Sequence, residues 1–166
     1  MCIRDRVKAG VYLLIRFSTI FHDVAVWNWL LIVVGMGTAV MSAVFAVQKT
    51  DLKKLTAYST VSHLGWIVAT IGVGTPFAIA GALVHTLAHA LFESSLFMLI
   101  GVIDHEAGSR DIRRLGPLWN KMPWTFCSVV IGAASMAAVP PLLGFVSKEG
   151  MLTAFEDAPI CLLYTS

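Results

Sequence analysis

The sequence predicts an all-α bundle of membrane-spanning helices, and two observations carry this prediction. Hydrophobic residues make up 57% of the chain and charged residues only 13%, whereas a soluble globular domain carries about 25% charged residues. The apolar residues also gather in long segments separated by short polar connections, as expected for membrane-spanning helices of about 20 residues each. A soluble chain of 166 residues could not cover its surface with so few charges.

The first apolar segment, residues 7–21, contains Lys8 and Arg16 and is short for a complete crossing. We interpret it as a spanning helix whose beginning has been cut away. The hexapeptides at residues 1–6 and 161–166 resemble translated sequencing-adapter read-through, and we expect both to be artefacts. Residues 7–160 would then be a truncated, internal fragment of a longer membrane domain, with roughly five helices.

The second apolar segment, residues 30–47, is uninterrupted and predicts a complete spanning helix. Gly35, Gly37 and Ala39 fall close together within it. Small residues at such spacing let two helix backbones approach closely in a membrane. We therefore expect these three residues to form a packing face.

A charged loop at residues 48–54 leads to a third helix over residues 55–73, which carries several polar side chains. A turn at residues 72–76 follows, and Pro76 is well placed for the first turn of the next helix. That helix is expected to run over residues 77–103.

The fourth helix contains His85, His89 and Glu93 within an otherwise apolar run. Four residues advance a helix by slightly more than one turn, so the three side chains share one face. A single buried histidine is most often a hydrogen-bonding residue between helices. Three titratable groups in register are expensive within a membrane, and they favour a pathway for protons or ions.

The last apolar segment, residues 123–155, follows a long polar connection and is interrupted by a proline pair at 140–141. Such a pair cannot continue a regular helix, and broken helices occur at membrane depth where they are buried or line a cavity. Lys148 and Glu149 follow the break directly. The sequence therefore predicts a broken helix that brings Lys148 to a functional position.

The distribution of basic residues predicts the orientation in the membrane. The loops at 48–54 and 104–122 would share one side, whereas the connections at 22–28 and 74–76 carry no lysine or arginine. Basic loops remain preferentially in the cytoplasm. We therefore expect the first two loops to be cytoplasmic, through Lys49, Lys53, Lys54, Arg110, Arg113, Arg114 and Lys121.

Composition also excludes other classes. The net charge of +2 comes without an extended basic patch and gives no indication of nucleic-acid binding. The three cysteines form neither a disulfide framework nor a zinc-spaced cluster.

Four blocks of the sequence resemble antiporter-like membrane proteins, the family shared by Mrp-type sodium/proton antiporters and respiratory complex I. The phrase IDHEAGSRDI at residues 103–112 is more similar to the large A subunit of the Mrp complex than to a complex I subunit. The four blocks, in family order, are VKAGVYLLIRF (7–17), DLKKLTAYSTVSHLG (51–65), HTLAHALFESSLFMLIGVIDHEAGSRDI (85–112) and PPLLGFVSKEG (140–150).

The resemblance implies a subunit of a hetero-oligomeric, bacterial inner-membrane antiporter that exchanges Na⁺ for H⁺. It implies a transporter rather than an enzyme, with no prosthetic group in this stretch. Residue by residue, Lys8, His85, His89 and Lys148 match the family's buried proton-relay positions. Glu93 stands where the family usually has lysine, a departure that places an anion beside His85 and His89 on the same helix face.

Our hypothesis is a water-linked proton relay formed by His85, His89 and Glu93 and leading toward Lys148, with Lys8 as a further carrier. His63 and Glu149 are possible accessory residues. One alternative is a proton-pumping, antiporter-like subunit of a complex I-type enzyme. Another is an intramembrane metalloenzyme that binds zinc through the same His–His–Glu set, although Thr86 stands where the zincin pattern has glutamate.

Overall fold

The computed structural model describes residues 2–21 and 24–156, with side chains described from Lys8 onward. The described residues form helices joined by short connections, which confirms the predicted all-α class. Residues 161–166 and the predicted polar break at 22–23 lie outside the described residues, while residues 2–6 belong to the first helix. The helices are α1 (Cys2–Phe21), α2 (Ala25–Val47), α3 (Leu52–Gly72), α4 (Pro76–Ala107), α5 (Leu118–Lys121), α6 (Pro123–Met136) and α7 (Leu143–Glu156).

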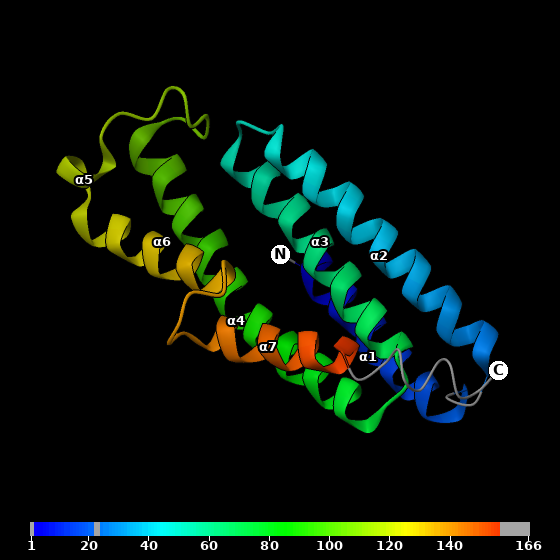
Figure 1. Ribbon diagram of the computed structural model, residues 1–166. Helices are drawn as coiled ribbons and strands as arrows, with labels where there is room; N and C mark the ends of the chain where they lie inside the picture. The colour runs from blue at the N-terminus through cyan, green and yellow to red at the C-terminus, as the bar shows by residue number, and fades with distance from the viewer. Residues whose placement is uncertain (1, 22–23, 157–166) are drawn as a thin grey trace.

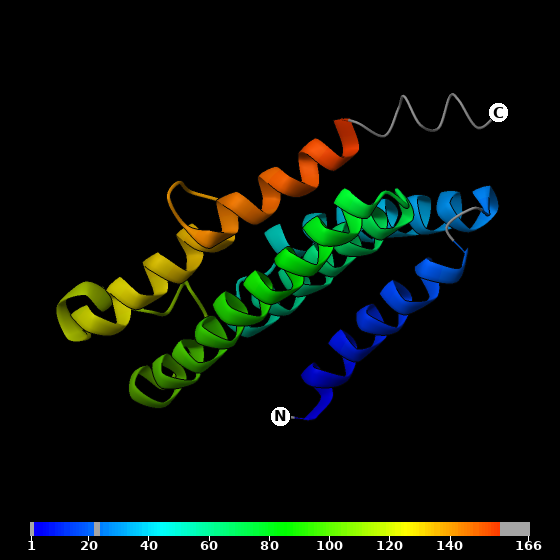
Figure 2. The ribbon, with the colours of Figure 1, turned by 90° about the horizontal axis from the view of Figure 1, so that it is seen from below.

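The helices are arranged around α3 and α4. Helices α2 and α3 lie side by side along their length, and α6 and α7 follow one another along α4 (Figure 1). Seen from below, α1 and α7 lie on opposite sides of α4 (Figure 2). Side chains of α1, α3 and α7 can therefore contact the face of α4 that points into the bundle.

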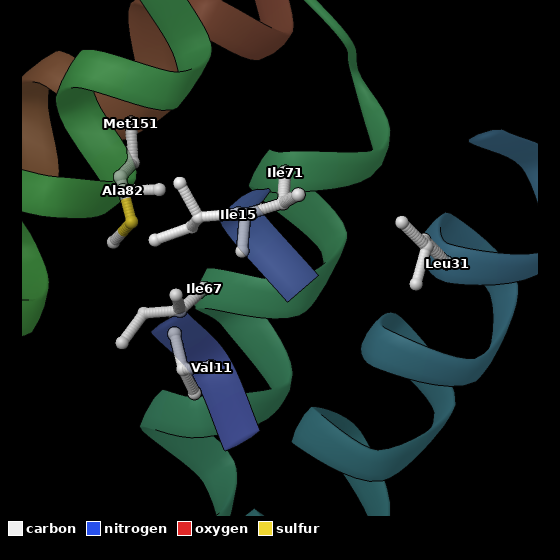
Figure 3. Packing of buried hydrophobic residues seen from close by; sticks show 7 residues of the cluster. All are labelled: Val11, Ile15, Leu31, Ile67, Ile71, Ala82 and Met151. Carbon is white, nitrogen blue, oxygen red and sulfur yellow. The ribbon is translucent and has the colours of Figure 1, made fainter. Parts of the chain in front are cut away.

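An apolar cluster holds α1, α2, α3, α4 and α7 together near one end of the bundle. In Figure 3 the isoleucines of α3 lie beside residues of α1, with α2 beyond them on one side and α4 on the other. The buried members are Val11, Ile15, Leu31, Ile67, Ile71, Ala82 and Met151. This cluster fixes the positions of the helices that surround the polar groups described below.

Two glycines set the distance between α2 and α3. A Cβ atom at Gly35 would lie 2.6 Å from the backbone nitrogen of Ala69, and one at Gly65 would lie 2.7 Å from the nitrogen of Ala39. The predicted packing face is therefore confirmed for Gly35 and Ala39. It is wrong for Gly37, where a Cβ atom would meet no atom within 4 Å.

Several predicted helix ends were wrong, because α2 and α3 begin earlier and α4 ends later than their apolar residues indicate. Helix α2 begins at Ala25 rather than at residue 30. Asp51 accepts hydrogen bonds from the backbone nitrogens of Lys53 and Lys54 at 2.9 and 3.2 Å, so α3 begins within the predicted charged loop. Helix α4 continues to Ala107, and Gly108 ends it in the left-handed conformation, with φ of 65°.

The two basic connections meet at one end of the bundle. The backbone nitrogen of Leu52 donates to the carbonyl of Arg110 at 3.1 Å, and that of Ile112 donates to the carbonyl of Thr50 at 3.0 Å. Asp51 and Asp111 thereby form a short antiparallel bridge. The prediction that these connections share a side agrees with this geometry.

The predicted break in the last segment is confirmed. Helix α6 ends at Met136 and α7 begins at Leu143, with a cis peptide bond between Pro140 and Pro141 in the connection. Gly144 lies so close to α6 that a Cβ atom there would overlap the carbonyl oxygen of Ser135. Helix α7 therefore starts against the end of α6 rather than continuing it.

By length and apolar composition, two of the described helices are able to cross a membrane alone, α2 and α4, and α6 is a shorter apolar helix. Helix α3 falls outside this group because its middle carries polar side chains. Of those side chains, Thr60 and His63 contact α4, whereas the hydroxyl of Ser62 donates to the carbonyl of Ala39 in α2.

Candidate functional site

The three predicted residues of α4 lie on one buried face. His85, His89 and Glu93 are 0%, 1% and 2% exposed, while Leu87 and Leu91 on the outer face are 63% and 55% exposed. The helix thus places titratable groups inside and large apolar groups outside. This is the reverse of a soluble helix and suits a membrane-embedded one.

His85 contacts both α3 and α7 through its two ring nitrogens. Nδ1 lies 2.9 Å from the hydroxyl oxygen of Ser147, and Nε2 lies 3.2 Å from Nδ1 of His63. Ser147 is itself 1% exposed. The resulting contact chain links three helices across the centre of the bundle.

His63 of α3 lies between the two histidines of α4. Its ring centroid is 5.4 Å from that of His85 and 5.2 Å from that of His89. Phe92 packs against the edge of the group, 5.3 Å from the His89 ring. His63, expected only as an accessory residue, is thus at the middle of the cluster.

Glu93 receives contacts from three directions. The hydroxyl of Thr60 donates to Oε1 at 2.5 Å. Oε2 lies 3.1 Å from Nδ1 of His89 and 3.6 Å from Nζ of Lys8. The His89 contact is an ion-pair distance without the alignment of a hydrogen bond. The carboxylate is therefore stabilised by a lysine of α1 and a hydroxyl of α3.

Lys148 lies where the break exposes backbone carbonyls. Its Nζ donates to the carbonyl oxygen of Met136 at 2.8 Å, at the carboxyl end of α6. Carbonyls at that end of a helix have no partner within the helix and attract a cation. Lys148 and His63 also line one cavity of about 240 Å³, together with Ser62, Trp66, Met151 and Leu152.

The structure brings five of the predicted residues into direct contact, places a sixth across a cavity and leaves one outside. Lys8, His63, His85, His89 and Glu93 are joined by the contacts above, and Lys148 faces His63 across the cavity. Glu149 has an exposed side chain on α7. Sequence reasoning missed Thr60 and Ser147. The polar run in α3 and the position of Ser147 beside Lys148 were the signals available for them.

The arrangement does not favour the metal-site alternative. Among residues 2–21 and 24–156, no group of three or more histidine, cysteine, aspartate or glutamate side chains converges in a way that could hold a metal ion. Both ring nitrogens of His85 already face partners in other helices.

A helix bundle with apolar outer faces and buried titratable groups on α4 defines a multi-pass membrane protein. The family described as NADH:quinone oxidoreductase/Mrp antiporter, transmembrane region, matches residues 6–165, and the chain belongs to this family. The resemblance described from the sequence is thereby confirmed.

Relatives that are named as antiporter subunits support the same assignment. The chain is 48% identical over 143 residues to the probable A/B subunit of a K⁺/H⁺ antiporter from Rhizobium meliloti, covering 86% of this chain and 14% of that protein. It is 46% identical over 159 residues to the A subunit of the Na⁺/H⁺ antiporter from Bacillus subtilis, covering 89% of this chain and 20% of that protein. It therefore spans about a fifth or less of these relatives.

A solved structure is similar in fold as well as in sequence. The structure of the Mrp complex from Dietzia sp. DQ12-45-1b contains a chain that superposes with a TM-score of 0.87 at 61% identity. The match covers 92% of this chain and 17% of that chain.

Proposed function

We propose that this chain is part of the A subunit of an Mrp-type monovalent-cation/proton antiporter, a transporter rather than an enzyme. The observation that carries the proposal is the buried row of titratable groups running from Lys8 through Glu93, His89 and His63 to the cavity of Lys148. The names of the relatives, antiporter subunits for Na⁺ or K⁺, support this class over a complex I-type subunit.

The chemistry of the row suits proton transfer. A carboxylate, neutral imidazoles and an amine can each accept and release one proton, and neighbouring members lie within direct contact or share a cavity. An isolated charge is costly to bury. A proton therefore moves along the row at a lower free-energy cost when a charge on a neighbouring residue moves at the same time and balances it. Cation exchange would be coupled to these transfers in the complete complex.

The proposal extends to surroundings and orientation. Residues 7–160 would belong to the proton-conducting domain, embedded in the bilayer of a bacterial inner membrane and held against other subunits of a hetero-oligomeric complex. The joined connections around Asp51 and Asp111 would face the cytoplasm because they carry the basic residues.

The test is Lys148→Ala in the full-length protein, assembled in its complex. Inverted membrane vesicles that hold a proton gradient are given Na⁺ or K⁺, and the loss of the gradient is followed with a pH-sensitive dye. We expect the variant to lose cation-driven proton movement. Lys121→Ala, an exposed position in α5, serves as the control and should retain it. Unchanged transport by an assembled Lys148→Ala complex would contradict the proposal.

A further inference from the structure

The hydroxyl of Ser147 lies within hydrogen-bond distance of both the His85 ring and the carbonyl of Gly144. A hydroxyl has one proton to donate, and a carbonyl oxygen only accepts. The Ser147 hydroxyl donates to the carbonyl of Gly144 at 3.1 Å. While that bond is made, the Ser147 oxygen accepts from Nδ1 of His85 at 2.9 Å; when the hydroxyl turns toward His85 instead, Nδ1 is the acceptor.

This assignment continues to His63. A neutral imidazole carries one proton, so Nε2 of His85 is then an acceptor. The atom facing it at 3.2 Å is Nδ1 of His63, which donates in this tautomer of His85. In neutral His63, Nε2 is the nitrogen left without a proton. His63 also lines the cavity that it shares with Lys148.

We propose that His63 carries protons between the Lys148 cavity and the histidines of α4, and that Ser147 positions His85 to receive them. The proposal rests on the proposed function, since it gives His63 a defined role within that pathway. The cavity, at about 240 Å³, exceeds the roughly 30 Å³ occupied by one water molecule, so water can link Lys148 to His63.

The transfer balances one proton in against one proton out. A proton arrives at Nε2 of His63 from the cavity, and the Nδ1 proton of His63 moves along the 3.2 Å contact to Nε2 of His85. His63 is left neutral with its proton on the opposite nitrogen. His85 then holds two protons and is a cation until it passes one on. Water takes the Nε2 proton of His63 and returns one to its Nδ1, which restores the starting tautomer without a change in charge.

A purely positioning role makes a different prediction. If His63 only holds His85 in place, any donor at the position of Nδ1 suffices. Asparagine supplies an amide donor near that position but does not carry a proton. His63→Asn therefore separates the two roles, and His63→Ala removes both.

The experiment compares these variants in full-length proteins assembled in the complex, using the gradient assay with Na⁺ and K⁺. We expect His63→Asn and His63→Ala to reduce cation-driven proton movement alike, by roughly tenfold or more. Ser59→Ala, on the same helix with its hydroxyl bonded to the Leu55 carbonyl, should transport normally.

Three results would overturn the proposal. Normal transport by His63→Asn with loss in His63→Ala would make His63 a positioning residue, and normal transport by both would remove it from the pathway. Failure of both to assemble, with Ser59→Ala normal, would make its role structural. Lys148→Ala, measured in parallel, shows whether the proposed function itself holds.

Discussion

Lys8 of α1 forms an ion pair with Glu93 of α4, with Nζ 3.6 Å from Oε2. The lysine side chain is 23% exposed and the glutamate side chain 3% exposed. Glu93 thus depends on a residue from another helix to balance its charge. The buried anion is accommodated by a cation nearby in space.

Lys8→Met should destabilise the assembled complex, because it leaves the buried carboxylate without its cation. Adding Glu93→Gln should recover part of the lost stability, with a coupling on the order of 1–3 kcal/mol between the two sites. Thermal unfolding of the single and double variants measures this coupling. If the changes in stability of the two single variants simply add in the double variant, the interaction between Lys8 and Glu93 does not stabilise the complex.

The row on α4 was predictable because it depends only on helical spacing. The position of His63 was not, since it depends on which face of α3 meets α4. That face is determined by the close contact of Gly35 with Gly65 and by packing around Ile67 and Ile71. No pattern within α3 alone specifies these contacts.

Helix ends were less predictable than helix existence. The apolar runs indicated each helix, but side-chain caps such as Asp51 extended α3 beyond its apolar residues. The roles of Ser147 and Thr60 could not be predicted for a different reason. Their roles come from partners far away in the sequence, at His85 and Glu93, rather than from their own neighbours.

Gly35→Ala should destabilise the contact between α2 and α3 by about 1–3 kcal/mol, because the added methyl group would meet the backbone of Ala69. Gly37→Ala is the matched control, two residues away on the same helix, where a Cβ atom meets nothing within 4 Å. Thermal stability and yield of the assembled complex measure the difference. Equal effects of the two substitutions would contradict the packing described for α2 and α3.

Single cysteines at Lys49 and Arg113 should react with a membrane-impermeant thiol reagent from the same side of the membrane, because backbone hydrogen bonds hold their connections together. The native cysteines are first replaced, including the exposed Cys127. The positive-inside tendency predicts that this side is the cytoplasm. Labelling of the two positions from opposite sides would be incompatible with the fold.

The central claim is that the buried histidines of α4 carry protons. Its most direct measurement is cation-driven proton movement by vesicles containing the full-length protein with His85→Gln and His89→Gln, which keep polar side chains but cannot exchange protons as imidazoles do. We predict that such a complex assembles yet moves no more protons than vesicles lacking the protein. Wild-type rates of proton movement by the assembled double variant would contradict the account.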